Sequence, residues 1–159
     1  MPAKRTSPTV AILSTQRAVR VPRKRIAELV ARLARQEGVR LTHVDVAVVT
    51  AREMAALNRR YLGCAGATDV LSFDMSDELS DGLVAQVVVC GGVAARQAPH
   101  HGNCAARELL LYVVHGLLHL TGYDDTTPAL AAEMHARAER LLADVYPLPT
   151  RRRPATRRR

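Results

Sequence analysis

The stretch from Asn103 to about Leu120 constrains the fold more than any other part of the chain, because its apolar residues are not confined to one side of a helix. With about 3.6 residues per turn, they cover almost the whole circumference. They are Leu109, Leu110, Leu111, Val113, Val114, Leu117 and Leu118. A helix that is apolar all round is stable in water only when other elements cover it. We therefore expect a central, buried helix that ends near Leu120, with Asn103 as the candidate N-cap residue.

Two histidines interrupt this apolar helix. His115 and His119 are four residues apart, so they lie on one face, separated by about 6 Å along the axis and roughly 40° around it. Buried imidazoles are unfavourable unless their nitrogens have partners, and one shared metal ion would satisfy both rings. The alternative is that each histidine has its own hydrogen-bond partner in the core.

The residues after this helix offer a third ligand. Gly122 is placed to end the helix in a left-handed turn, after which the chain can fold back toward the two histidines. Either Asp124 or Asp125 could then complete the site, and the other would suit a role in orienting an imidazole N–H. Three protein ligands and one open position are typical of a catalytic metal site.

These ligand types predict one divalent metal ion, with zinc favoured. Zinc peptidases of the H-E-x-x-H kind place their general-base glutamate where this chain has Gly116, so an ordinary zinc peptidase is excluded. A metal ion can still acidify water to near neutrality without that glutamate. Two imidazoles and one carboxylate also match the facial triad of iron oxygenases, so these residues alone do not fix the metal.

The surrounding sequence supplies strands and helices that could cover the central helix. Strands are expected at residues 9–14, 44–49, 70–73 and 84–89, and helices at 22–37, 50–61 and 128–145. Thr50 and Glu53 have the spacing of a capping box directly after a buried strand, which indicates the start of an α/β layer. We predict an α+β fold in which a small mixed β-sheet is covered by helices and the metal-binding helix is buried, as a zincin-like layered domain.

Charge and composition limit the partners and the compartment. The formal charge of +8 includes six arginines after residue 150, and without them it falls to +2. This terminal run is expected to be disordered and to act either as a solubilising tail or as a tether to polyanions such as RNA. With no Trp, one Phe and four Tyr, the chain has little material for aromatic base-stacking platforms. Three cysteines without a C-x-x-C pair, and no apolar run of signal-peptide or membrane-spanning length, predict a cytoplasmic protein that does not enter the membrane.

Residues 115–125 read H-G-L-L-H-L-T-G-Y-D-D, which resembles the core signature of the YbeY family, H-G-x-L-H-L-x-G-Y-D-H. The resemblance extends to N-R-R-Y at residues 58–61, T-D-V-L-S-F at residues 68–73 and further blocks at 93–98 and 132–134. It covers most of residues 40–145. It implies a zinc-dependent, single-strand-specific endoribonuclease that acts in 3′-end maturation of small-subunit rRNA and in ribosome biogenesis, with RNA as substrate and ribosomal proteins as candidate partners.

The resemblance also bears on individual residues. The family's third zinc ligand, usually His, falls on Asp125, which favours Asp125 over Asp124, and carboxylate is an accepted zinc ligand. The family usually carries an RNA-handling Arg where this chain has Leu62, and we expect Arg59 and Arg60 to contact RNA phosphates instead.

These departures keep a second interpretation open, a non-catalytic ribosome-assembly binding factor that contains a metal ion. No general base is assigned, and Asp124 is the nearest candidate. The predicted organisation is a disordered N-terminus (1–8), a single metal-dependent hydrolase domain (9–147) and a disordered Arg-rich tail (148–159).

Overall fold

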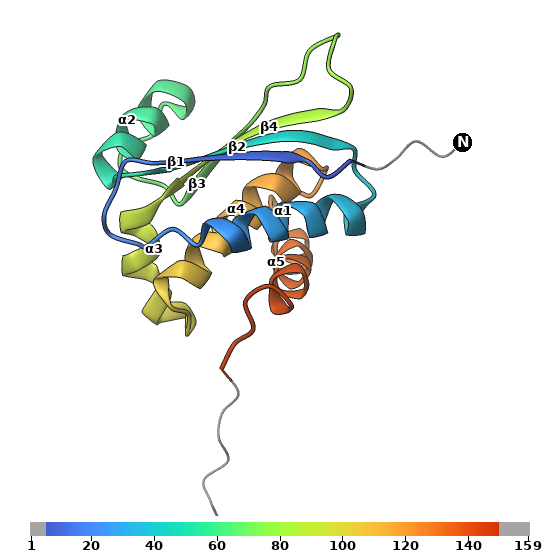
Figure 1. Ribbon diagram of the computed structural model, residues 1–159. Helices are drawn as coiled ribbons and strands as arrows, with labels where there is room; N and C mark the ends of the chain where they lie inside the picture. Colours follow the sequence, from blue (N-terminus) through green and yellow to red (C-terminus); the bar gives the residue numbers. More distant parts are fainter. Residues whose placement is uncertain (1–5, 150–159) are drawn as a thin grey trace, which may run out of the picture.

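The computed structural model describes residues 6–149 and contains, within them, a four-stranded sheet and five α-helices (Figure 1). The strands are β1 (Thr9–Ser14), β2 (Leu41–Val49), β3 (Val70–Asp74) and β4 (Leu83–Cys90). The helices are α1 (Arg23–Glu37), α2 (Ala51–Leu62), α3 (Gly91–Gln97), α4 (Ala105–Leu120) and α5 (Pro128–Ala143), with a short 3₁₀ helix at Ala98–His101. Every element expected from the sequence is present, with ends shifted by at most about three residues, the usual uncertainty of such boundaries.

The sheet is mixed, as predicted. Its strand order is β1-β2-β4-β3, with β1, β2 and β4 parallel and β3 antiparallel to β4. In this register Val87 of β4 lies between Val46 of β2 and Ser72 of β3. Strand β3 forms one edge of the sheet and packs against α4. It is the only antiparallel strand among the described strands.

Helices α1, α3, α4 and α5 gather on one face of the sheet, while α2 lies at one end of the sheet and contacts α3 (Figure 1). Helix α4 packs against β3 and β4 and is flanked by the other three helices of this layer. Its leucines and valines are buried except for the partly buried Leu120, and Leu109, Leu110, Leu117 and Leu118 have no exposed surface. This arrangement confirms the prediction of a buried central helix, because each side of α4 meets either the sheet or another helix.

Local sequence signals account for two of the helix ends. At the start of α2 the Thr50 hydroxyl accepts a hydrogen bond from the Glu53 amide, and the Glu53 carboxylate accepts one from the Thr50 amide, so the capping box is confirmed. At the end of α4 the amides of Gly122 and Tyr123 donate to the carbonyls of His119 and Leu118. This is the Schellman pattern, and Gly122 supplies its positive φ of 107°.

The segment before α4 differs from the sequence analysis in two respects. The N-cap residue of α4 is Cys104 rather than Asn103, and the Asn103 side chain instead contacts Arg107 and Glu108 in the first turns of the helix. Helix α3 and the 3₁₀ helix were not expected, because the paired glycines Gly91 and Gly92 are typical of a chain break after a strand. In the fold they begin α3 directly, and Gly91 lies so close to Gln16 that a Cβ there would clash with the Gln16 side chain.

The predicted N-terminal and C-terminal disordered segments fall mostly outside the described residues. Residues 6–8 and 147–149 have no helix or strand, and the arginines of the predicted tail are beyond residue 149. Among the helices of residues 6–149, none combines the length and the apolarity needed to cross a membrane.

Candidate metal centre

The two histidines of α4 lie in different surroundings. His115 is half-buried, and its Nε2 atom is the one buried side-chain nitrogen or oxygen in residues 6–149 that has no hydrogen-bond partner. The His119 side chain is 35% exposed. Helix packing thus fixes His115 more firmly than His119. A buried, unpaired ring nitrogen is unfavourable on its own, which is what one expects of a metal ligand without its ion.

The turn after α4 brings one carboxylate to the exposed histidine. Asp125 Oδ2 lies 3.5 Å from His119 Nε2. The neighbouring Asp124 is used differently, because its Oδ1 accepts from the amides of Asp125 and Thr126 and its Oδ2 accepts from the Thr126 hydroxyl. Asp124 therefore stabilises the turn, and the geometry favours Asp125 as the acidic partner of the two histidines.

The hydrogen bonds of Asp124 also limit its chemistry. The Thr126 hydroxyl and amide stabilise its charged form and hold the pKa of this carboxyl below its usual value. A carboxylate with a lowered pKa is a weak general base. Asp124 is thus a poor choice for that role.

Asp125 contacts His119, but these two residues and His115 do not form a finished coordination sphere. Within residues 6–149, no three His, Cys, Asp or Glu side chains already converge as they would around a bound ion. The donor set nevertheless fits a zinc ion, since it offers two imidazoles, a carboxylate and the unpaired Nε2 of His115. We expect an ion to bind with rotation of the His119 and Asp125 side chains, which are 35% and 56% exposed.

Burial sets the protonation state of His115. Removal of the ring from water lowers its pKa below 6.5, although the carboxylates of Asp69 and Asp125 act in the opposite direction. The imidazole is accordingly neutral near pH 7, the form that binds a metal ion.

Gly116 faces the sheet. A Cβ at this position would meet Val87 Cγ1 at 2.9 Å and Val70 Cγ2 at 3.0 Å. A glutamate at this point of the helix would therefore run into β3 and β4. The packing gives a physical reason, beyond the motif itself, why the general base of H-E-x-x-H peptidases has no counterpart here.

A pocket of about 320 Å³ opens beside His115. Its walls come from the loop before β3, the segment before α4, α4 itself and α5, and its polar lining consists of Asp69, His101, Asn103, Glu108, Tyr112, His115, His135 and Glu139. The His135 ring of α5 lies 6.0 Å from the His115 ring, centroid to centroid. Sequence reasoning missed Asp69 and His135 as site residues, although Asp69 lies in one of the blocks that resemble the YbeY family.

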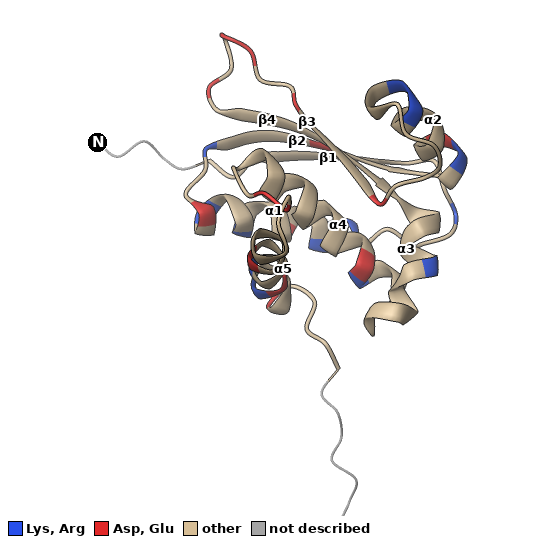
Figure 2. Ribbon diagram, turned by 180° about the vertical axis from the view of Figure 1, so that it is seen from behind, with Lys and Arg blue, Asp and Glu red and all other residues tan. Residues whose placement is uncertain are grey.

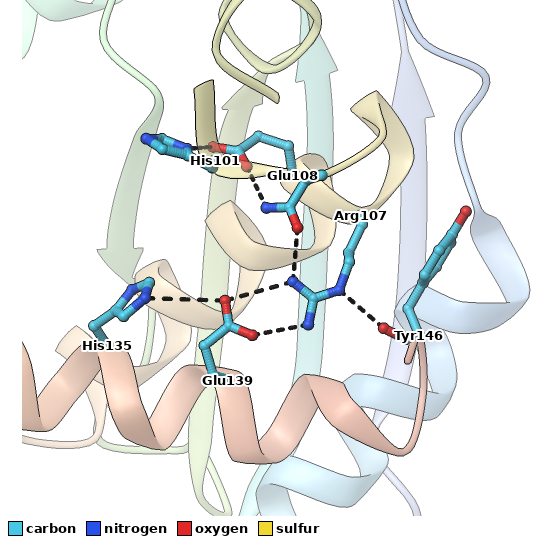
Figure 3. Close-up of polar contacts among 7 residues, drawn as sticks. His101, Arg107, Glu108, His135, Glu139 and Tyr146 are labelled. Atoms are coloured by element: carbon cyan, nitrogen blue, oxygen red, sulfur yellow. Dashed lines mark hydrogen bonds and ion pairs between the residues drawn. The ribbon is translucent and has the colours of Figure 1, made fainter. Parts of the chain in front are cut away.

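A network of buried charges holds one wall of this pocket in place (Figure 3). Arg107, which is 3% exposed, donates to Glu139 of α5 at 2.8 Å and to the Asn103 side chain at 2.8 Å. The fully buried Glu108 is hydrogen-bonded to His101 Nδ1 and Asn103 Nδ2, each at 2.7 Å. These contacts hold Asn103, Glu108 and Glu139 in place along the pocket.

The predicted RNA-contacting arginines lie elsewhere. Arg59 and Arg60 are exposed near the C-terminal end of α2, where Figure 2 shows basic residues. Arg60 lies over the ring of Tyr61, and Tyr61 packs edge-on against Phe73 with 5.1 Å between ring centroids. Neither arginine lines the pocket beside His115, and Leu62 next to them is 61% exposed. The structure thus does not join these arginines to the histidines.

Comparison with known proteins points to one family. The family model described as Endoribonuclease YbeY matches residues 11–146. A protein named Endoribonuclease YbeY from Moorella thermoacetica is 41% identical over 112 residues, which are 64% of this chain and 72% of that protein. A protein of the same name from Salinispora tropica is 42% identical over 113 residues, covering 63% and 72% of the two chains.

A solved structure agrees with the fold. The solution structure of TM1509 from Thermotoga maritima is similar with a TM-score of 0.59 and 26% sequence identity, over 94% of this chain and 100% of that one. The family match begins at the third residue of β1 and covers the rest of the sheet together with α1 to α5. On these grounds the chain belongs to the YbeY endoribonuclease family.

Proposed function

We propose that the protein is a metal-dependent, single-strand-specific endoribonuclease that acts in the cytoplasm on the 3′ end of small-subunit rRNA during ribosome biogenesis. The observation that carries this proposal is the unpaired Nε2 of His115 beside the contact between His119 and Asp125. These three residues would hold one divalent ion, with zinc favoured. The names of the relatives from Moorella thermoacetica and Salinispora tropica support RNA as the substrate.

The ion would supply Lewis-acid polarisation of a phosphodiester oxygen or of an attacking water. The chain's own residues have separate tasks. Packing of α4 orients His115, and Asp124 holds the turn that presents Asp125. A carboxylate in place of a third imidazole leaves the centre less positive, so we expect weaker acidification of water than a three-histidine centre gives.

We propose that Arg59 and Arg60 bind phosphates of the substrate at a place other than the scissile bond. Both side chains are exposed and basic, and such residues position a nucleic acid through its phosphates without reading its sequence. Because neither arginine lines the pocket beside His115, we give both a role in binding rather than in the chemical step.

The proposal is tested with purified full-length protein and an RNA that contains the 3′ region of small-subunit rRNA. We expect His119→Ala, or a chelator, to reduce cleavage by at least roughly a hundredfold, since even outer-sphere partners of a metal change activity by about 10- to 100-fold. His100→Ala is the matched control, because His100 is exposed and does not line the pocket. Cleavage that survives both the chelator and His119→Ala would remove the metal from the chemistry.

The second candidate is a ribosome-assembly binding factor that uses the ion only to hold the end of α4. Exposed Leu62 in place of the family's RNA-handling arginine favours it. This candidate predicts RNA binding that responds to zinc, with the RNA intact on a gel after prolonged incubation. The cleavage assay above therefore separates the two.

A further inference from the structure

The pocket beside His115 carries a surplus of hydrogen-bond acceptors. Three carboxylates line it, from Asp69, Glu108 and Glu139. A phosphate group would be repelled from such a pocket, since like charges at short range are strongly unfavourable where water is partly excluded. An occupant must bring N–H donors.

Two of these carboxylates are already used. Glu108 is hydrogen-bonded to His101 and Asn103, and Glu139 is held by Arg107. Asp69 differs, because its Oδ1 accepts from the Val70 amide at 2.8 Å and from the Thr68 hydroxyl at 3.3 Å, while its Oδ2 has no donor among the described residues. Asp69 Oδ2 is thus a fixed carboxylate oxygen that is free to accept.

The size and the lining of the pocket suit one flat ring. Its volume of about 320 Å³ is at the lower end of the roughly 300–1,000 Å³ typical of small-molecule sites. The rings of His101, Tyr112, His115 and His135 and the side chain of Leu111 also form its walls. Aromatic and imidazole rings are the surfaces on which bases of single-stranded RNA stack once they are splayed out. His135 Nε2 keeps capacity for a ligand, because its distance of 3.9 Å from Glu139 exceeds a hydrogen bond.

We propose that this pocket seats one splayed-out nucleobase of the RNA substrate, and that it selects a base with an exocyclic amino group, which donates to Asp69 Oδ2. The inference rests on the proposed ribonuclease function, and it adds a preference for adenine, guanine or cytosine over uracil next to the metal centre. Carboxylates accept from base amino groups in the same way in known nucleic-acid recognition. The phosphates of the bound strand stay outside the pocket.

The test compares strands that differ by one amino group. Binding of the full-length protein is measured to 2′-O-methyl uridine octamers with one central adenosine or one central purine riboside, which lacks only the 6-amino group. A gel run after the measurement checks that the strands are intact. We expect the adenosine strand to bind about tenfold more tightly, the effect of one hydrogen bond to a charged group. Equal affinities for the two strands would overturn the proposal, whatever the behaviour of any variant.

The Asp69→Asn variant tests whether the preference for the amino group comes from Asp69. Asparagine keeps an Oδ1 acceptor for the Val70 amide and replaces the free oxygen by a donor, so we expect the tenfold preference to disappear while thermal unfolding shows a folded protein. Asp81→Asn is the matched control, since it removes the same charge from the exposed connection between β3 and β4 and should leave the preference unchanged. A full preference in folded Asp69→Asn would also overturn the assignment.

The outcomes distinguish this inference from the proposed function. A preference for the amino group without any cleavage would contradict the proposed ribonuclease activity and support base recognition in the pocket. Cleavage that depends on the metal, combined with equal binding of the two strands, would reject the pocket alone.

Discussion

The unpaired Nε2 of His115 is the feature on which the site depends most. Burial of a polar atom without a partner opposes folding, and few such atoms occur in native proteins. Here it lies on a helix whose buried positions from residue 109 onward are mostly apolar, and it is near a second histidine and a carboxylate. The same burial that makes the atom unfavourable in the metal-free protein keeps it neutral and ready to bind an ion.

This burial predicts a pH dependence for the metal-free protein. The pKa of His115 is lower in the folded state than the unfolded value near 6.5, so the unfolded chain takes up the proton first as the pH falls. Stability is therefore fully present above the unfolded pKa and is lost as the pH falls through 6.5 toward the folded pKa. Urea unfolding of chelator-treated protein at several pH values measures this loss. We expect His115→Gln to have a smaller loss, and an identical pH profile for the variant would contradict the interpretation.

The close packing of Gly116 predicts the sign of the change in the free energy of unfolding when this glycine is replaced by alanine. Alanine in the middle of a helix is ordinarily more stable than glycine by about 1 kcal/mol. At position 116 the added Cβ meets Val87 and Val70 at 3.0 Å or less, so we expect Gly116→Ala to lower the free energy of unfolding by about 1–3 kcal/mol.

Gly92→Ala in α3 is the control for this substitution. Its Cβ would have an ordinary contact of 3.5 Å with Ala51, and we expect no loss of stability. Chemical denaturation of both variants measures the difference. A stabilised Gly116→Ala would mean that α4 does not approach the sheet as closely as described.

At the level of elements, the sequence predicts the helices that have a clear local signal. The apolar run of α4, the capping box of α2 and the glycine after α4 each predict a local structure without knowledge of the rest of the fold, and each is confirmed. Helix α3 is missed because it has only seven residues and begins with two glycines, whose propensity opposes a helix. Packing against α4 and α2 overrides that propensity.

The same contrast holds within the site. His115, His119 and Asp125 belong to one short segment, so their helical spacing and the turn at Gly122 are enough to predict that they lie close together. Asp69 and His135 come from a loop before β3 and from α5. Nothing in the sequence pattern brings these two to His115, because only the packing of α4 between the sheet and α5 does so. The pocket could therefore not be predicted from the sequence.

For the molecule as a whole, an ion bound only by the folded state must stabilise it. We expect zinc at a hundredfold excess over its dissociation constant to raise the free energy of unfolding by about 2.7 kcal/mol. Asp124→Asn keeps an acceptor for the turn amides and should retain this stabilisation, whereas Asp125→Asn and His119→Ala should lose most of it. Thermal unfolding with and without zinc provides the measurement. Loss of the zinc effect in Asp124→Asn alone would reassign the third ligand.

The charge network between α4 and α5 has a consequence for protein synthesis. Glu139 and His135 of α5 form a wall of the pocket, and Arg107 holds that wall through Glu139 (Figure 3). In order of translation α5 comes after every other element that lines this cavity. A nascent chain can thus position His115, His119 and Asp125 while the cavity still lacks one side. The pocket could therefore bind a base only after α5 has emerged from the ribosome and packed against α4.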